Sequence, residues 1–349
     1  MKRAFLIITL LIYIIGCSED KSSDAEIIDL NVSSLSNENL TIKSIELNSE
    51  TKHIYLFIDS DLNNIEFPLT AYADFELSSG ATIPSVSKGE IQFSSPDEVK
   101  NIDIKAEDGT INSWYMFLIH RQVQNSNFET WFDNKGMNGL YYKEIGSSYE
   151  TSFWSTANLG TSIYGKYGTQ PLIEGTEQYV KIMTDSTITL PLTAATLFTG
   201  KFNLAGATSN PTDPKKAIIF GIPFKFKPTA MKFKYKYQAG KRYIQATVNN
   251  PSDIFGGFTV NEIEGEDRCS IYAILEARNG DEVNEIARAE LYSETTQDVL
   301  TETILSFNYT SNEEPTHITI VFASSKDGDL WKGAVGSTLI IDDLELLYE

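Results

Sequence analysis

Cysteine and histidine are scarce in this sequence of 349 residues. It contains two cysteines, Cys17 and Cys269, and three histidines, His53, His120 and His317. No pair of histidines has a spacing typical of zinc ligands, which argues against a zinc hydrolase. Cys269 lies in an apolar, strand-like run, so we expect a buried and inert thiol there rather than a reactive one.

Basic side chains are also in a clear minority. The chain has 28 lysines and arginines against 48 aspartates and glutamates, a formal net charge of −20. So large an acidic excess argues against binding to nucleic acid and to anionic membrane surfaces, because both repel a negatively charged protein. It fits a solvated extracellular protein.

Long apolar runs are absent except near the N-terminus. Ala4–Ile15 is almost wholly apolar, follows two basic residues and ends at Gly16 and Cys17. This layout predicts a secretory signal over residues 1–16, too short to span a bilayer comfortably. The stretch "LIYIIGC" resembles a bacterial lipobox, which implies that Cys17 carries lipid in the outer membrane. The acidic residues after it resemble the surface-export signal of Bacteroidetes lipoproteins. The alternative is an ordinary secretory peptide with a chance cysteine.

Catalytic motifs are missing as well. The sequence has no phosphate-binding loop, no Gly-x-Ser-x-Gly and no evident Cys–His pairing. A glycosidase needs two carboxylates that flank one bond. Glu144, Glu150, Glu174 and Asp185 lie in or near loops, but no spacing singles out a pair.

Short strands separated by turn residues are what the sequence does contain. Residues 17–38 are polar and predict a flexible tether, with an additional edge strand as the alternative. Residues 39–122 alternate in short strands and turns, which predicts an Ig-like β-sandwich acting as a spacer. A polar stretch at 121–126 then marks a boundary.

Residues 125–349 predict a second, larger sandwich. In "FKFKPTAMKFKYKY" aromatic residues alternate with Lys225, Lys227, Lys232, Lys234 and Lys236 with the period of two that is typical of strands. No amphipathic helix longer than about two turns is apparent. The lysines are expected on a solvent face, or alternatively in a site for acidic polysaccharide. The predicted fold class is all-β, with a jelly roll following the Ig-like module.

Several stretches in this second region occur in a familiar order: "NSNFETWF", "FWSTANLG", "AATLFTGKF", "FGIPFKFKPTAMKFKYKY" and "STLIIDDLELLYE". Together they resemble the Bacteroidetes family named putative carbohydrate metabolism domain. The resemblance implies a jelly roll similar to carbohydrate-binding modules, and some members carry a glycoside hydrolase label. It therefore implies a connection with sugars more firmly than it implies catalysis.

Two adjacent aspartates interrupt the last apolar strand. Strict alternation places Asp342 on the face of Leu344 and Leu346, and leaves Asp343 on the wetter face. A buried carboxylate needs a partner. The resemblance implies a structural calcium between the first and last strands, with Asn127, Glu129 and Asp342 as ligands, because oxygen ligands suit calcium. The alternative is that backbone amides or a lysine satisfy Asp342 without a metal.

Aromatic residues crowd the loops of the second region, among Ser, Thr, Asn and Gly. Such rings can stack on the flat faces of sugars. We expect ligand contacts from these aromatics and from a nearby acidic turn, at Tyr141, Tyr142, Trp154, Trp331, Asp327 and Asp329. For most of the aromatics the alternative is core packing, and for the aspartates it is a simple turn.

The sequence therefore predicts a lipid-anchored surface protein that binds a glycan or polysaccharide, together with partner proteins of polysaccharide utilisation. A glycoside hydrolase is the first alternative. A structural or adhesive surface protein without a glycan ligand is the second.

Overall fold

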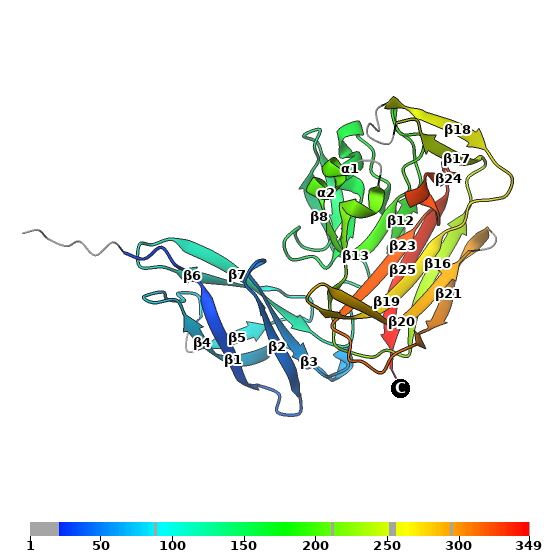
Figure 1. The fold of residues 1–349 in the computed structure, drawn as a ribbon. Helices are drawn as coiled ribbons and strands as arrows, with labels where there is room; N and C mark the ends of the chain where they lie inside the picture. Colours follow the sequence, from blue (N-terminus) through cyan, green and yellow to red (C-terminus); the bar gives the residue numbers. More distant parts are fainter. Residues whose placement is uncertain (1–20, 87–88, 211–212, 251–255, 294–295, 349) are drawn as a thin grey trace, which may run out of the picture.

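The structure is a computed structural model that describes residues 21–86, 89–210, 213–250, 256–293 and 296–348. Two β-sandwiches follow one another along the chain (Figure 1). The predicted signal peptide and the predicted lipidation site at Cys17 lie outside the described residues. Within those residues, no helix has both the length and the apolar character needed to cross a bilayer.

The N-terminal sandwich packs a three-stranded sheet against a four-stranded one. The first sheet has the order β1 (Ile27–Leu35), β4 (Leu69–Leu77) and β5 (Glu90–Phe93). The second has the order β2 (Ile42–Asn48), β3 (His53–Ile58), β7 (Ile111–Ile119) and β6 (Lys100–Lys105). Between them lies an apolar core that includes Trp114, Phe93 and Leu56. A short helix, η1 (Leu62–Asn64), follows β3.

The predicted tether is wrong where β1 forms. β1 pairs antiparallel with β4, with register shifts between Ile27 and Asp29 and between Val32 and Ser34. These irregularities break strict alternation, although Ile27, Leu30, Val32 and Leu35 are all buried. β1 lies at the edge of its sheet, so the edge strand given as the alternative to a tether is present. The polar composition and the broken period explain why the sequence favoured a tether.

The C-terminal sandwich is built from an eight-stranded and a five-stranded sheet. The five-stranded sheet has the order β11 (Thr169–Glu174), β12 (Glu177–Met183), β25 (Thr338–Leu347), β16 (Ala230–Gln238) and β21 (Gln297–Ser306). The path of the eight-stranded sheet is β10 (Trp154–Thr156), β13 (Thr196–Phe202), β23 (His317–Ala323), β19 (Ser270–Asn279), β20 (Glu282–Tyr292) and β22 (Asn308–Tyr309). Two short strands extend it, β14 (Ile218–Phe220) beside β13 and β15 (Ile222–Pro223) beside β23.

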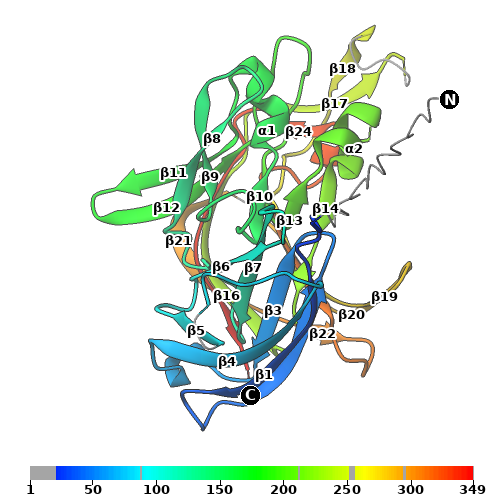
Figure 2. The same cartoon turned by 90° about the vertical axis from the view of Figure 1, so that its left-hand side faces the viewer.

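Smaller elements complete this sandwich. A hairpin joins β8 (Trp131–Lys135) to β9 (Tyr141–Ile145), and a small sheet has the order β18 (Phe258–Glu262), β17 (Tyr243–Val248) and β24 (Lys332–Ala334). The helices are α1 (Asn158–Thr161), α2 (Leu204–Ser209), η2 (Ser162–Tyr164), η3 (Pro214–Ala217) and η5 (Gly328–Leu330). None of these helices exceeds two turns, and the predicted all-β fold class is confirmed. Figure 2 shows the β11–β12 hairpin extending beyond the body of the sandwich.

The alternation predicted for β16 is confirmed. Met231, Phe233, Tyr235 and Tyr237 are buried, and the lysines between them point away from the core. Phe233 meets Phe322 of the opposite sheet edge to face, with ring centroids 5.9 Å apart. Burial of aromatic area on one face of the strand therefore decides its orientation.

The alternation predicted for β25 places Leu344 and Leu346 correctly on the core side, but it is wrong before them because a β-bulge interrupts the strand. Leu339 and Ile341 are buried before the bulge, and Leu344 and Leu346 are buried after it. The register against β16 shifts between Asp342 and Glu345, and Asp343 has φ +50°. One inserted residue moves the apolar side chains from odd to even positions while they keep facing the core.

The neighbour of β25 also changes at the bulge. β12 pairs with β25 only from Thr338 to Ile341. Beyond that point the linker between the sandwiches takes its place, since the amide of Leu344 donates to the Ser126 carbonyl at 3.0 Å. The Gln122 side chain then makes two hydrogen bonds of 2.7 Å with the backbone of Leu346. The linker thus satisfies an edge that would otherwise have open backbone groups.

The two sandwiches share one hydrophobic cluster. Tyr55, Phe57 and Phe117 of the N-terminal sandwich belong to the same buried set as Phe153 and Phe224 of the second. The rings of Phe117 and Phe153 stack at 5.0 Å with 19° between their planes. The N-terminal sandwich is thus docked by apolar contact, which disfavours the free domain motion expected of a simple spacer.

We expect Phe153→Ala to lower the free energy of unfolding by about 3 kcal/mol, as is usual when a buried Phe is truncated. Phe153 is 7% exposed, whereas Tyr141 is 68% exposed. Tyr141→Ala is therefore the matched control, with an expected change within about 0.5 kcal/mol. Denaturant unfolding of both variants measures the difference, and equal midpoints would contradict the docked interface.

Candidate functional site: a groove between the two sandwiches

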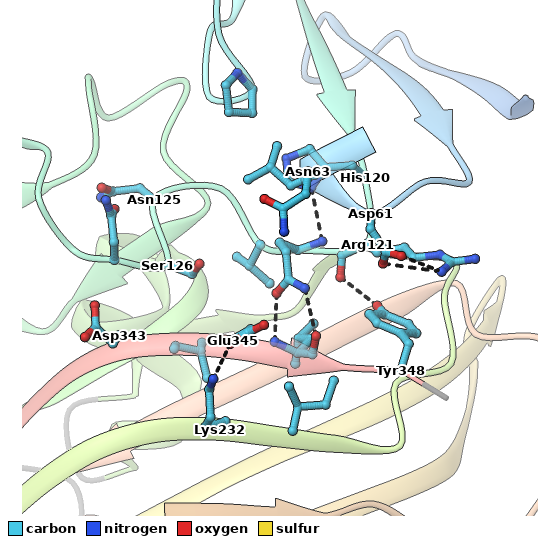
Figure 3. Close-up of a pocket in the computed structure, with 18 of the residues that line it drawn as sticks. Asp61, Asn63, His120, Arg121, Asn125, Ser126, Lys232, Asp343, Glu345 and Tyr348 are labelled. Atoms are coloured by element: carbon cyan, nitrogen blue, oxygen red, sulfur yellow. Dashed lines mark hydrogen bonds and ion pairs between the residues drawn. The ribbon is translucent and has the colours of Figure 1, made fainter. Parts of the chain in front are cut away.

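A groove of about 970 Å³ lies where the two sandwiches meet. Its floor is the outer face of the five-stranded sheet, at β16 and β25. Its far wall comes from the N-terminal sandwich, at η1 and the loop that contains Pro96 and Asp97. The linker at residues 120–127 closes the corner between them (Figure 3).

Paired charges cover the floor of the groove. Lys232 contacts Glu345 at 2.5 Å, and Lys234 contacts Asp343 at 2.6 Å. The prediction that the lysines face away from the core is confirmed for those on β16, and so is the exposure of Asp343. Lys225 instead contacts Glu46 of the N-terminal sandwich. Each hydrogen bond to its carboxylate raises the pKa of the lysine concerned, so both lysines are charged at neutral pH.

Carboxylates outnumber cations in the lining of the groove. Three basic side chains stand against five acidic ones, which leaves two formal negative charges: Arg121, Lys232 and Lys234 against Asp61, Asp97, Glu302, Asp343 and Glu345. His120 adds no charge, because burial lowers its pKa to about 4. A ligand in this groove would therefore meet donors and acceptors but no excess of positive charge.

The linker is held to both sandwiches. Arg121 donates from Nε to Asp59 at 3.0 Å and from Nη1 to Asp61 at 3.3 Å. Its guanidinium lies 5.2 Å from the centre of the Tyr348 ring, and the Tyr348 hydroxyl donates to the Arg121 carbonyl at 2.6 Å. These contacts fix the width of the groove at its inner end.

His120 is a buried polar residue at the corner of the groove. It is 1% exposed, and its Nδ1 accepts the backbone N–H of Gln122 at 3.1 Å. Among the described residues its Nε2 has no hydrogen-bond partner. The ring orders the start of the linker, and its low pKa keeps it neutral.

The predicted aromatic contacts do not gather at one place. Trp154 is 2% exposed and donates from Nε1 to the Gln124 carbonyl at 2.9 Å, so its indole is part of the core. Tyr142 is also buried and stacks on Tyr167 at 5.0 Å. Both rings are thus unavailable to a ligand in this structure. Tyr141, the preceding residue of β9, is exposed, because neighbouring residues of a strand point to opposite faces.

Trp331 is half-buried in the turn between η5 and β24, and it does not line the groove. Its ring lies 4.8 Å from that of Phe258. The two predicted aspartates near it hold ion pairs, Asp327 with Lys332 at 3.1 Å and Asp329 with Lys215 at 2.6 Å. None of these residues lines the groove.

Asp342 is buried, as expected of a carboxylate that needs a partner. It is 5% exposed, and within the described part of the chain its Oδ1 accepts no hydrogen bond. Burial raises its pKa to about 6; the charges of Asp343 and Glu129 add to the rise, and that of Lys234 opposes it. Because Asp342 follows the core residue Ile341, it lies on the outer face of the sheet rather than on the core side predicted by strict alternation.

The three predicted calcium ligands separate. Glu129 is close enough to Asp342 for their charges to interact. Asn127 instead lines the groove, because Phe128 has φ +58° and the regular strand begins only at Trp131. Asn127 and Glu129 therefore do not lie on one face of a regular first strand, as the predicted ligand set would require. No cluster of three or more His, Cys, Asp or Glu side chains suited to a metal occurs in the described ranges.

Glu144, expected in or near a loop, lies instead on strand β9 and is also a buried acid. Glu144 is 4% exposed and accepts a hydrogen bond from the Thr156 hydroxyl at 3.0 Å. Burial raises the pKa of Glu144 to about 7 and lowers that of nearby Lys201 to about 8. Glu144 lines neither described pocket, so the geometry does not support a catalytic role.

Comparison with known proteins agrees with the architecture. A crystal structure titled as a putative glycoside hydrolase from Bacteroides thetaiotaomicron VPI-5482 is 24% identical, with a TM-score of 0.55, and the match covers 96% of this chain and 99% of that one. A second such title, from Bacteroides vulgatus ATCC 8482, is also 24% identical, with a TM-score of 0.51 over 64% of this chain and 97% of that one. At this identity the likeness shows a shared fold.

The chain is thus an all-β protein of two docked sandwiches with a polar groove between them. Residues 127–347 match the family described as putative carbohydrate metabolism domain, and the chain belongs to that family. The resemblance inferred from its sequence stretches is confirmed. A comparison with curated proteins finds no match.

Glu144 makes a clear prediction about pH. Its pKa rises from 4.5 in the unfolded chain to about 7 in the fold, so its ionisation destabilises the folded protein as the pH rises between these values. Glu144→Gln removes the ionisable group, so the variant should not lose stability as the pH rises. At pH 8 the variant should be more stable than the wild type by about 2–3 kcal/mol, and at pH 4 the two should be nearly equal.

The exposed Glu150, six residues further on, provides the control. Glu150→Gln should leave the dependence of unfolding free energy on pH unchanged. A Glu144→Gln variant whose stability follows that of the wild type across this range would contradict the buried, protonated state.

Proposed function

We propose that this protein is a cell-surface lipoprotein that binds a neutral glycan in the groove between its two sandwiches. The observation that carries the proposal is the groove itself. It has the volume of a site for several sugar rings, and it is floored by the outer face of a sheet in a carbohydrate-related family domain.

The chemistry of the lining favours hydroxyl groups. Sugar hydroxyls donate and accept hydrogen bonds at once, so they suit a surface where cations and carboxylates alternate. Lys232 and Lys234 offer donors, and Glu345 and Asp343 offer acceptors beside them. Hydrogen bonds to charged groups are stronger than those between neutral groups.

The same pairing disfavours an acidic polysaccharide. A uronate would have to displace Asp343 or Glu345 from its lysine, and the lining already carries two excess negative charges. The lysine row is therefore better suited to positioning neutral sugars than to binding carboxylates. Tyr141 and Trp331 keep exposed ring surface, but neither belongs to the groove.

The proposal includes the lipid anchor at Cys17 in the outer membrane, an Ig-like identity for the N-terminal sandwich, and a role beside other proteins of polysaccharide utilisation. Export signals and the carbohydrate-related family support it. Hydrolysis is the competing function, and release of sugar from the same probes during long incubation would favour it over binding.

The test uses residues 18–349 with neutral hexasaccharides of β-1,4-linked glucose, xylose and mannose, and with a hexamer of galacturonic acid as the charged probe. Lys234→Ala should weaken binding of the neutral probe about tenfold or more, since a charge-assisted hydrogen bond contributes more than 1.4 kcal/mol. Calorimetry measures the dissociation constant.

Lys236→Ala is the matched control, because Lys236 lies on the same face of β16 but outside the groove lining. It should bind like the wild type. Equal loss in both variants, or binding only of the galacturonic acid hexamer, would contradict the proposed site.

We also propose that Asp342 and Glu129 hold a structural calcium ion. An unpartnered buried carboxylate oxygen beside a second carboxylate fits a cation with oxygen ligands. The remaining ligands would come from backbone carbonyls and water, because the described residues contain no group of three or more His, Cys, Asp or Glu side chains suited to a metal. The ion would join the start of the C-terminal sandwich to its last strand.

Removal of calcium tests this. Millimolar calcium should raise the melting temperature of the wild type above that in chelator by roughly 3–8 °C, because a ligand bound only to the folded state stabilises it. Asp342→Asn should lose this response, while Asp298→Asn, at an exposed position on β21, should retain it. An equal melting temperature of the wild type in calcium and in chelator would contradict the proposed calcium site.

A further inference from the structure

We infer that the N-terminal sandwich is part of the binding site, and that Asn63 and Asn64 of η1 select among neutral glycans bound in the groove. The inference rests on the proposed function and adds a specificity-determining wall to it. Both asparagines line the groove opposite the charged floor. The predicted spacer would then have a direct part in recognition.

The two asparagines are free to contact a ligand. Both are exposed, and within the described residues neither side-chain amide makes a hydrogen bond. Figure 3 shows Asn63 projecting into the groove from the side of the N-terminal sandwich, above the linker. An amide presents a donor and an acceptor side by side and carries no charge. That combination suits neighbouring hydroxyls of a neutral sugar.

The short helix that carries them is held in place. Asp61, at its N-cap, accepts the Arg121 guanidinium, and the backbone N–H of Asn64 donates to the Asp61 carbonyl at 3.0 Å. Ile65, which follows, is 6% exposed and anchors the other end in the core of its sandwich. The asparagines therefore project from a fixed support rather than from a mobile loop.

The whole wall is also fixed relative to the floor. Phe117 and Phe153 stack across the interface, and Lys225 of the second sandwich pairs with Glu46 of the first while lying 4.9 Å from the Phe57 ring centre. Interfaces with a buried aromatic core resist domain motion. A groove that keeps its width before a ligand arrives loses less entropy on binding.

The wall and the floor offer different chemistry. Paired ions on the floor can bind hydroxyls of any sugar in reach, so they supply affinity with little selectivity. Uncharged amides at fixed positions distinguish sugars by where their hydroxyls lie, because an unmatched amide or hydroxyl loses a hydrogen bond on leaving water. Selectivity among neutral glycans should thus depend on the N-terminal sandwich.

The test is a double variant, Asn63→Ala with Asn64→Ala, in residues 18–349, probed with the same three neutral hexasaccharides. We expect at least a fivefold loss of affinity for the preferred probe and a smaller loss for the other two. The ratio of affinities between the preferred probe and the others should therefore fall. Asn31→Ala is the matched control, since Asn31 is exposed on β1 of the same sandwich and outside the groove. Its affinities should equal those of the wild type.

A second measurement protects the result against misfolding of the variant. In the wild type, the preferred hexasaccharide should slow hydrogen exchange at residues 61–65 as well as in β16. Binding by the wild type with an unchanged double variant and no protection at 61–65 would overturn this inference alone and leave the floor as the site. Failure of the wild type to bind any probe would overturn the proposed function and this inference with it.

Discussion

The arrangement of the whole molecule depends on how the linker pairs with the last strand. β12 stops pairing with β25 at Ile341, which leaves the backbone of the following residues without a neighbour. Ser126 and the side chain of Gln122 supply the missing hydrogen bonds at Leu344 and Leu346. The side-chain amide of Gln122 makes the pair of hydrogen bonds that a neighbouring strand would otherwise make with Leu346. Backbone groups buried away from water need hydrogen-bond partners, and here the linker supplies them. These contacts hold the two sandwiches at a fixed angle, which defines the groove.

The bulge at Asp342 and Asp343 belongs to the same constraint. It lies where one neighbour of β25 gives way to another, and the extra residue lets both halves of the strand bury their leucines and isoleucines. Asp343 turns outward to Lys234 at the floor of the groove, while Asp342 remains beneath the start of the second sandwich. One irregularity in a strand therefore separates a carboxylate that lines the groove from a buried one.

The local features of this fold were predictable from sequence, and the site was not. Alternation identified β16 and its outward lysines, because the period of two along a strand is a local property of the sequence. The same rule failed at β25 and at Phe128, where a bulge and a positive φ interrupt the period. Trp154 lay among polar loop residues yet is buried, since a backbone carbonyl of the linker satisfies its N–H. The groove joins η1 to β25, about 280 residues apart along the chain, and no local pattern records that pairing.

The late position of β25 has a consequence for how the protein is made. This strand follows all the other strands described, and the linker cannot pair with it until it exists. The N-terminal sandwich can form earlier, but Tyr55, Phe57 and Phe117 then remain uncovered until the second sandwich folds against them. During that interval the nascent protein presents an aromatic face to its surroundings. The surface that later makes the groove rigid is thus the one most in need of protection during synthesis.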